Sequence, residues 1–273
     1  FSLAYFTDSG SLDHYALTDF DGENDAGATM TLQGDDKIVV AGYTEGATGY
    51  DIALARYDLS GSLDTTFGVE GRQVIDVTGN YDRPYAVVAR PGGPLVVVGA
   101  ALNPFYDFAV LQLTEAGALD SSFAEDGIQF TEFGGSLDYG YAAALQPDGK
   151  LVAAGRYYPG VPFFGLARFN PDGSLDTSFD GDGLVSGYME GGYARDVAIQ
   201  PDGKIVAVGN TFGSDFITVR FNADGSLDTT FAGDGMAVTD IAGDNDYAEA
   251  VLLQADGKIV VGGSSSSEFA LVR

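Results

Sequence analysis

One unit recurs along this chain, and its repetition constrains the fold more than any other feature. The clearest copy, Gln200 to Gly235, contains two short apolar runs rich in β-branched and aromatic residues, which is typical of strands. Asp-Gly steps flank these runs, and glycine accepts the positive φ that a tight turn requires. The glycine that ends the first run recurs at Gly42, Gly99, Gly155, Gly209 and Gly263, at spacings of 57, 56, 54 and 54 residues. Five repeats of a β-structured unit therefore account for the chain.

Each repeat predicts four antiparallel strands, which are called A to D in chain order. Tight turns join A to B at residues 35–37, 92–94, 148–150, 202–204 and 256–258. A single four-stranded sheet cannot bury both of its faces, whereas a ring of such sheets can. No stretch has the 3.6-residue apolar period of a helix, and the coils of a β-helix, the main alternative, are shorter than this repeat. We therefore expect residues 1–273 to form one all-β domain, a five-bladed β-propeller with four-stranded antiparallel blades.

Copies of strand C stand at both ends of the chain, at Phe1 and at Phe269. A copy of strand D, HYALTDF from His14, follows the first of them. We expect N-terminal strands to pair with the C-terminal blade and close the ring, which leaves one strand C copy surplus. The sequence leaves open which copy lies in the ring and whether the chain is part of a longer array.

Several motifs resemble the repeat of one known family. QPDGK at Gln146 and Gln200, PDGSLDTSF at Pro171 and ADGSLDTTF at Ala223 are close to the repeat of the bacterial delta-60 repeat proteins. The resemblance covers essentially the whole chain, and it implies a β-propeller domain of unknown function. It also implies an extracytoplasmic location, because such repeats occur mostly in secreted or surface-exposed proteins. Departures such as Gln112 in place of arginine indicate degenerate blades.

The charge balance excludes some classes of partner. The chain has 40 acidic against 13 basic residues, a net charge of −27, which argues against binding to nucleic acid or to anionic membranes. Aspartate outnumbers glutamate by 31 to 9, so most of this charge belongs to turns and loops. The absence of cysteine excludes disulfides and thiolate metal sites. No apolar run is long enough for a membrane span, and the start at Phe1 indicates a mature or trimmed form.

Charged residues recur at fixed positions of the repeat. We expect structural ion pairs between one strand C position and one loop position, formed by Arg56, Arg168, Arg220 and Arg273 with Asp64, Asp176 and Asp228. The GSLD loops also offer oxygens of the kind that Ca²⁺ binds, at Asp172, Asp176, Asp224 and Asp228. These loops lack the bidentate glutamate of an EF-hand, and aspartate in turns usually bonds its own backbone. We therefore expect no cofactor, with calcium in these loops as the alternative.

Catalytic signals are weak. His14 is the only histidine, so a catalytic triad or a histidine metal site would depend on that residue. Paired carboxylates could serve a glycoside hydrolase, but here the acids repeat from unit to unit, and no tryptophan is present for sugar stacking. The sequence therefore favours a protein that is not an enzyme, with a hydrolase as the third hypothesis.

Variable loops indicate a binding face. The turns between strands A and B are similar in all repeats, whereas the loops between B and C differ in each. In a four-stranded meander the B–C and D–A loops share one face, which collects Tyr43, Tyr50, Tyr81, Tyr106, Tyr139, Tyr157, Tyr158 and Tyr247. We expect a protein-interaction or scaffold module without a transmembrane segment. Its expected partner is a protein with a basic surface. A glycan-binding propeller is the alternative hypothesis.

Overall fold

The computed structural model describes residues 1–21, 24–34, 36–102, 104–135, 137–188, 192–241, 243, 245–266 and 268–273. These residues form two compact units, Phe1–Phe130 and Thr131–Arg273. Both are built from strands and turns, which confirms the all-β prediction. Within the described ranges there is no helix that is long and apolar enough to cross a membrane. The predicted turn residue Asp35 lies outside the described residues.

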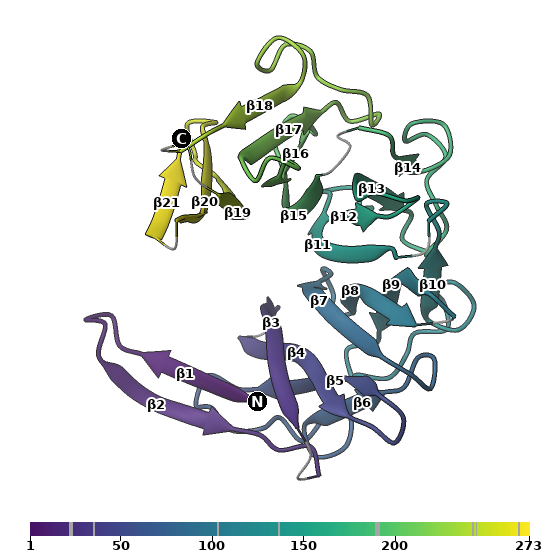
Figure 1. Ribbon diagram of the computed structural model, residues 1–273. Coiled ribbons are helices and arrows are strands. Elements are labelled where there is room, and N and C mark those ends of the chain that lie inside the picture. The colour runs from purple at the N-terminus through teal and green to yellow at the C-terminus, as the bar shows by residue number, and fades with distance from the viewer. Residues whose placement is uncertain are drawn as a thin grey trace. The chain divides into compact units, whose positions relative to one another are not determined.

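The first unit contains one two-stranded and two four-stranded antiparallel sheets (Figure 1). The strand orders are β1-β2, β3-β4-β5-β6 and β7-β8-β9-β10. Each four-stranded sheet is thus a meander in the predicted order A to D. The strands are β1 (Ser2–Phe6), β2 (Leu12–Leu17), β3 (Asp25–Gln33), β4 (Lys37–Glu45), β5 (Tyr50–Tyr57), β6 (Arg72–Ile75), β7 (Asp82–Ala89), β8 (Leu95–Leu102), β9 (Tyr106–Leu113) and β10 (Ile128–Thr131).

The second unit contains two four-stranded sheets and one three-stranded sheet, again all antiparallel. The orders are β11-β12-β13-β14, β15-β16-β17-β18 and β19-β20-β21. The strands are β11 (Tyr139–Leu145), β12 (Leu151–Tyr157), β13 (Phe163–Phe169), β14 (Leu184–Val185), β15 (Tyr193–Ile199), β16 (Ile205–Asn210), β17 (Phe216–Phe221), β18 (Met236–Thr239), β19 (Asp246–Leu253), β20 (Ile259–Ser265) and β21 (Glu268–Val272).

The predicted A–B turns are tight hairpins. The amide of Gln200 donates to the carbonyl of Lys204, and the amide of Gly203 donates back to Gln200. The same pair of bonds recurs at Gln146 and at Gln254. Gly203 has a φ of 86°, a conformation that an L-residue with a Cβ adopts only at a cost. The Asp-Gly signal therefore marked these hairpins correctly.

In the four four-stranded sheets, the central strands B and C are buried along most of their length, and neighbouring sheets of one unit pack against each other. In the first unit, Val39 and Leu54 of one sheet share an apolar core with Val97 and Leu111 of the other. In the second unit, the corresponding core joins the sheets of β11–β14 and β15–β18. Burying each such side chain contributes about 1.5–3 kcal/mol. The stacking of small sheets is thus what stabilises them.

Strand A carries a β-bulge at the same place in all five sheets that contain it. The register shifts fall between Gly27 and Thr29, Pro84 and Ala86, Gly140 and Ala142, Ala194 and Asp196, and Ala248 and Ala250. A bulge inserts one unpaired residue and redirects its side chain. The inserted residues include Tyr141, Arg195 and Glu249, which are taken up below as part of the candidate site.

The prediction of five complete four-stranded blades with a paired closure was wrong in part. The structure has four complete sheets, one sheet of strands A to C, and the hairpin β1–β2, which matches strands C and D. The described ladders include none between this hairpin and the sheet β19–β21. The hairpin partner of β2 is the strand just before it, because closing a short loop costs less entropy than pairing distant segments. Both copies of strand C therefore lie in sheets of their own.

Candidate functional site

The predicted pairs between strand C arginine and loop aspartate are present in three repeats. The Nε of Arg56, Arg168 and Arg220 donates to Asp64, Asp176 and Asp228 at 2.9, 2.7 and 2.7 Å. A lysine that sequence reasoning missed joins each pair, namely Lys37, Lys150 and Lys204. For Arg273, no ion pair is seen in the described part of the chain. The acid in each of the three loops is therefore held by two cations.

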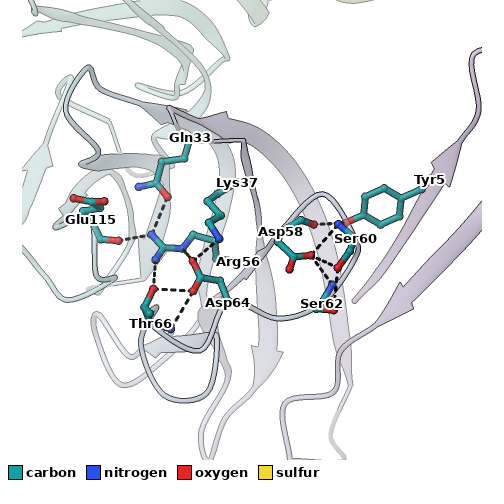
Figure 2. A network of polar contacts seen from close by, with 10 residues as sticks. All are labelled: Tyr5, Gln33, Lys37, Arg56, Asp58, Ser60, Ser62, Asp64, Thr66 and Glu115. Atoms are coloured by element: carbon teal, nitrogen blue, oxygen red, sulfur yellow. Dashed lines mark hydrogen bonds and ion pairs between the residues drawn. The ribbon is translucent and has the colours of Figure 1, made fainter.

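Figure 2 shows the first of these networks. The guanidinium of Arg56 donates to Gln33 of strand A, to Thr66 of its own loop and to the carbonyl of Glu115, a residue of the next repeat. It also lies 4.9 Å from the ring centroid of Phe67. Arg56 is 5 % exposed, so these contacts replace water almost completely. The arginine thus links neighbouring sheets of the first unit, which is a structural role.

The loop aspartates also bind their own backbone, as predicted. Asp64 accepts hydrogen bonds from the Thr66 amide and hydroxyl, and Asp120 accepts the same pair from Ser122. In the second repeat Gln112 replaces arginine and still donates to Asp120 at 2.9 Å. A neutral donor therefore preserves the loop geometry without the charge.

We expect this protein to lose stability below pH 4. Burial alone would raise the pKa of Asp64, but the Thr66 bonds and the charges of Arg56 and Lys37 outweigh it and lower the pKa to about 2. A carboxyl whose folded pKa is depressed stabilises the fold above its unfolded pKa, and loses this effect as the pH falls through the folded value. The urea concentration at the midpoint of unfolding, measured by circular dichroism, should therefore decrease as the pH is lowered from 4 to 2. Asp64→Asn should flatten this decline, and an unchanged slope in the variant would contradict the assignment.

The four aspartates considered for calcium already have donors. Asp172 and Asp224 each accept bonds from the amide and the hydroxyl of the serine two residues later. Asp176 and Asp228 do the same with Ser178 and Thr230 and are held by lysine and arginine as well. This arrangement favours a structural role for the loops, and calcium there stays an unsupported prediction.

Three of the predicted tyrosines meet in the first unit. The ring centroids of Tyr43 and Tyr50 are 4.8 Å apart, and those of Tyr50 and Tyr81 are 5.6 Å apart. The guanidinium carbon of Arg83 lies 5.0 Å from the centroid of Tyr43 and 5.1 Å from that of Tyr50. The variable loops thus bring together aromatic rings around one cation, which fits the predicted character of this face.

The second unit contains a larger cluster of tyrosine and arginine side chains. Arg156 lies 4.5 Å from the ring centroid of Tyr139, and Arg195 lies 5.1 Å from Tyr141 and 4.8 Å from Tyr193. All five side chains are half-buried. We call these residues, Tyr139, Tyr141, Arg156, Tyr193 and Arg195, the tyrosine–arginine surface. Its rings hold the two guanidinium groups in fixed positions by cation–π contact.

Two of these residues owe their position to the bulges. Tyr141 and Arg195 are the inserted residues of β11 and β15, and Arg195 also lies 3.9 Å from Glu249, the inserted residue of β19. In addition, the Nε atoms of Arg156 and Arg195 are buried and donate no hydrogen bond within the described residues. The two guanidinium groups are therefore held mainly by ring contacts, with Glu249 as the acid beside Arg195.

Tyr157 is a correction to the predicted binding face. It is 6 % exposed, and its ring stacks between Phe133 and Phe163 at centroid distances of 5.5 and 5.4 Å. Its hydroxyl accepts a bond from the amide of Gly187 at 2.7 Å. A side chain enclosed in this way belongs to the core. Tyr106, Tyr158 and Tyr247 stay at least partly accessible, and their role in binding stays a prediction.

The single histidine lies in the hairpin β1–β2. The ring of His14 stacks on Tyr5 at 4.1 Å, and its Nδ1 lies 3.0 Å from a carboxylate oxygen of Asp13. Its Nε2 is buried and has no hydrogen-bond partner among the described residues.

Comparison with sequence families gives the affiliation of the chain. A family described as a domain of unknown function (DUF5122) beta-propeller matches residues 33–67, 93–123, 146–179, 200–231 and 254–273. These segments cover more than half of the chain. The chain belongs to this family. The five matches coincide with the five repeats, so the propeller expected from the delta-60 resemblance is confirmed at the level of the DUF5122 fold.

One solved structure with a TM-score above 0.5 agrees with this DUF5122 fold. The periplasmic gluconolactonase PpgL of Pseudomonas aeruginosa superimposes with a TM-score of 0.59 and 17 % identity, over 99 % of this chain and 77 % of that one. Sqt1 from Chaetomium thermophilum, solved bound to the N-terminus of ribosomal protein L10, gives 0.46 and 14 %, over 92 % and 72 %. At 17 % identity, the likeness to PpgL shows the fold alone. No curated protein matches the sequence significantly.

Sequence reasoning missed several residues of the DUF5122 surface. Tyr141 and Tyr193 lie in the first half of a strand A, and Arg83, Arg156 and Arg195 belong to no repeated motif, so nothing singled them out. One signal was present: these arginines are among only 13 basic residues, and each lies within two residues of a tyrosine. In a chain of charge −27, arginine outside the repeat pattern could have been examined as a binding residue.

Proposed function

We propose that this DUF5122 propeller is a non-enzymatic protein-interaction module that binds through the tyrosine–arginine surface. The observation that carries the proposal is the stacking of Arg156 and Arg195 on tyrosine rings whose side chains are half-buried. Tyrosine and arginine are the residues most enriched at energetic centres of protein interfaces, because they combine apolar area with directional donors. Stacking also fixes the arginine rotamers, so less entropy is lost on binding.

The partner has a basic surface in this proposal. A net charge of −27 attracts such a partner over long range and accelerates its encounter, whereas the aromatic contacts supply most of the affinity. The resemblance to repeats of secreted and surface-exposed proteins supports an extracytoplasmic location. The recurrence of the acids from repeat to repeat supports the absence of catalysis, since a catalytic pair would be unique.

Replacing two tyrosines of the surface should abolish partner recovery. Immobilised protein carrying Tyr141→Ala and Tyr193→Ala is expected to retain about tenfold less of its partner than the wild type in pull-downs from the source cells, quantified by mass spectrometry. Arg195 loses both of its ring contacts in this variant, whereas Arg156 keeps its contact with Tyr139. Tyr15→Ala is the matched control, because Tyr15 is 66 % exposed on β2 of the other unit.

Salt dependence separates the alternatives. The amount of a basic protein partner that is recovered should decrease as the salt concentration rises from about 0.05 M to about 0.5 M, because the Debye length shortens. Equal recovery by the double variant and the wild type would contradict the proposal. Salt-independent binding of an oligosaccharide, lost in the double variant, would instead establish the glycan-binding alternative.

A further inference from the structure

Two groups of three aspartates occupy equivalent positions in two repeats. One consists of Asp51, Asp76 and Asp82 in the first unit, and the other of Asp215, Asp240 and Asp246 in the second. In each group, one oxygen per carboxylate lies within 4.8 Å of the others. One aspartate lies at the start of strand C (Asp51 within β5, Asp215 directly before β17), one follows strand D, and one begins the next strand A. Neither group includes an aspartate of the GSLD loops.

Close carboxylates of this kind repel one another. In the first group, burial raises the pKa of Asp51, and the charges of Asp76 and Asp82 raise it further. Without a cation or a donor, each additional carboxylate makes ionisation of its neighbours less favourable. What distinguishes the two groups is how the buried member is satisfied.

The buried aspartate of the first group has a complete set of donors. Asp82 is 0 % exposed, and its Oδ2 accepts bonds from the amides of Val77 and Thr78 at 2.8 and 3.2 Å. Its Oδ1 accepts the Thr78 hydroxyl at 2.8 Å. Both oxygens therefore have partners within the protein.

The buried aspartate of the second group lacks a donor for one of its two oxygens. Asp246 is also 0 % exposed, and its Oδ2 accepts the Ile241 amide at 2.6 Å. Its Oδ1 has no hydrogen-bond donor among the described residues. The sequence has alanine at position 242, where the first group has Thr78, so the hydroxyl is missing from the motif. A buried carboxylate oxygen without a partner is costly, and such exceptions call for an explanation.

A second buried oxygen without a donor lies beside Asp246. Asn210 is 1 % exposed, and its Nδ2 donates to the carbonyl of Asp246 at 3.0 Å. The Oδ1 of Asn210 has no donor among the described residues. Three close carboxylates, one of which has an unpaired buried oxygen, offer the kind of ligands that a hard divalent cation takes, and Asn210 next to them has a further unpaired oxygen.

We propose that Asp215, Asp240 and Asp246 bind one calcium ion. Oxygens bind Ca²⁺ at 2.3–2.6 Å, so two ligands on opposite sides of the ion are about 4.6–5.2 Å apart. The observed limit of 4.8 Å accommodates this arrangement. Three carboxylates leave room for water ligands, which suits calcium with its six to eight oxygens better than magnesium with its stricter octahedron. The ion supplies Asp246 with the partner that Asp82 obtains from Thr78.

Calcium binding to the full chain tests this site. After removal of metal with a chelator, isothermal titration with CaCl₂ should show one site with a Kd below about 1 mM, which MgCl₂ does not occupy. Asp240→Asn should weaken it at least tenfold. This change keeps the oxygen that accepts the Gly243 amide at 2.8 Å, so the loop stays formed. If Asp240→Asn changes the melting temperature of the metal-free protein, Asp215→Asn serves as the second variant.

The first group provides the matched control. Asp76→Asn, at the position equivalent to Asp240, should leave the affinity unchanged, and so should Asp224→Asn in a GSLD loop. Absence of a site tighter than about 1 mM would overturn the proposal. So would retention of full affinity in both Asp240→Asn and Asp215→Asn, or an equal loss in Asp76→Asn.

Discussion

Replacing Gly209 with alanine is expected to lower the free energy of unfolding by about 3 kcal/mol or more. Gly209 pairs with Ala194 next to the bulge of β15, and a Cβ at this position would lie 1.9 Å from the carbonyl oxygen of Tyr193. No side chain can give way here, because the obstacle is backbone. The bulge would have to rearrange, and the buried ladder of β15 and β16 with it. Urea unfolding followed by circular dichroism measures the loss.

Gly262→Ala is the matched control for this substitution. Gly262 stands one residue before the equivalent glycine of β20, and a Cβ there meets nothing closer than 3.7 Å. The same chemical change should therefore leave the unfolding midpoint nearly unchanged. Similar midpoints for Gly209→Ala and Gly262→Ala would show that the bulge tolerates a Cβ, which would contradict the close approach.

Asp176→Ala is expected to destabilise the second unit by about 3–5 kcal/mol, the cost of leaving buried charge unpaired. The side chain of Asp176 is 8 % exposed and accepts bonds from Arg168 at 2.7 Å and Lys150 at 2.8 Å. Burial would raise its pKa, but these cations and the Ser178 bonds hold the pKa well below its ordinary value. Its removal leaves both cations without their carboxylate partner and removes the bonds that it accepts from Ser178 in the loop. The midpoint of urea unfolding at pH 7 reports the effect.

Two comparisons make this prediction specific. Asp172→Ala removes an exposed carboxylate whose bonds are confined to Ser174, so it should have little effect. Arg168→Gln should cost less than Asp176→Ala, because Gln112 makes the equivalent bond to Asp120 in the second repeat. A smaller loss for Asp176→Ala than for Arg168→Gln would show that the network is not centred on the acid.

Local sequence signals determined the repeat and much of its interior. The Asp-Gly turns, the alternation of short apolar runs and the recurring Arg168–Asp176 spacing each act over fewer than ten residues. Hairpin geometry and the eight-residue reach from arginine to aspartate follow from such short-range chemistry. The sequence by itself therefore determined the strands, their order within a repeat, the family and the structural ion pairs.

Tertiary structure decided the rest, since it depends on contacts between repeats. The bulges that redirect Tyr141 and Arg195 have no signature in a single strand, and the burial of Tyr157 results from Phe133 and Phe163 on either side. The pairing of β2 with β1 was a competition between partners that the sequence could not rank. Likewise, the sequence shows Thr78 in one group and alanine at the equivalent position 242 in the other, but only packing shows that Asp82 has a donor for each oxygen and Asp246 does not. Hydrogen-bond satisfaction is a property of the folded neighbourhood, so it could be seen only there.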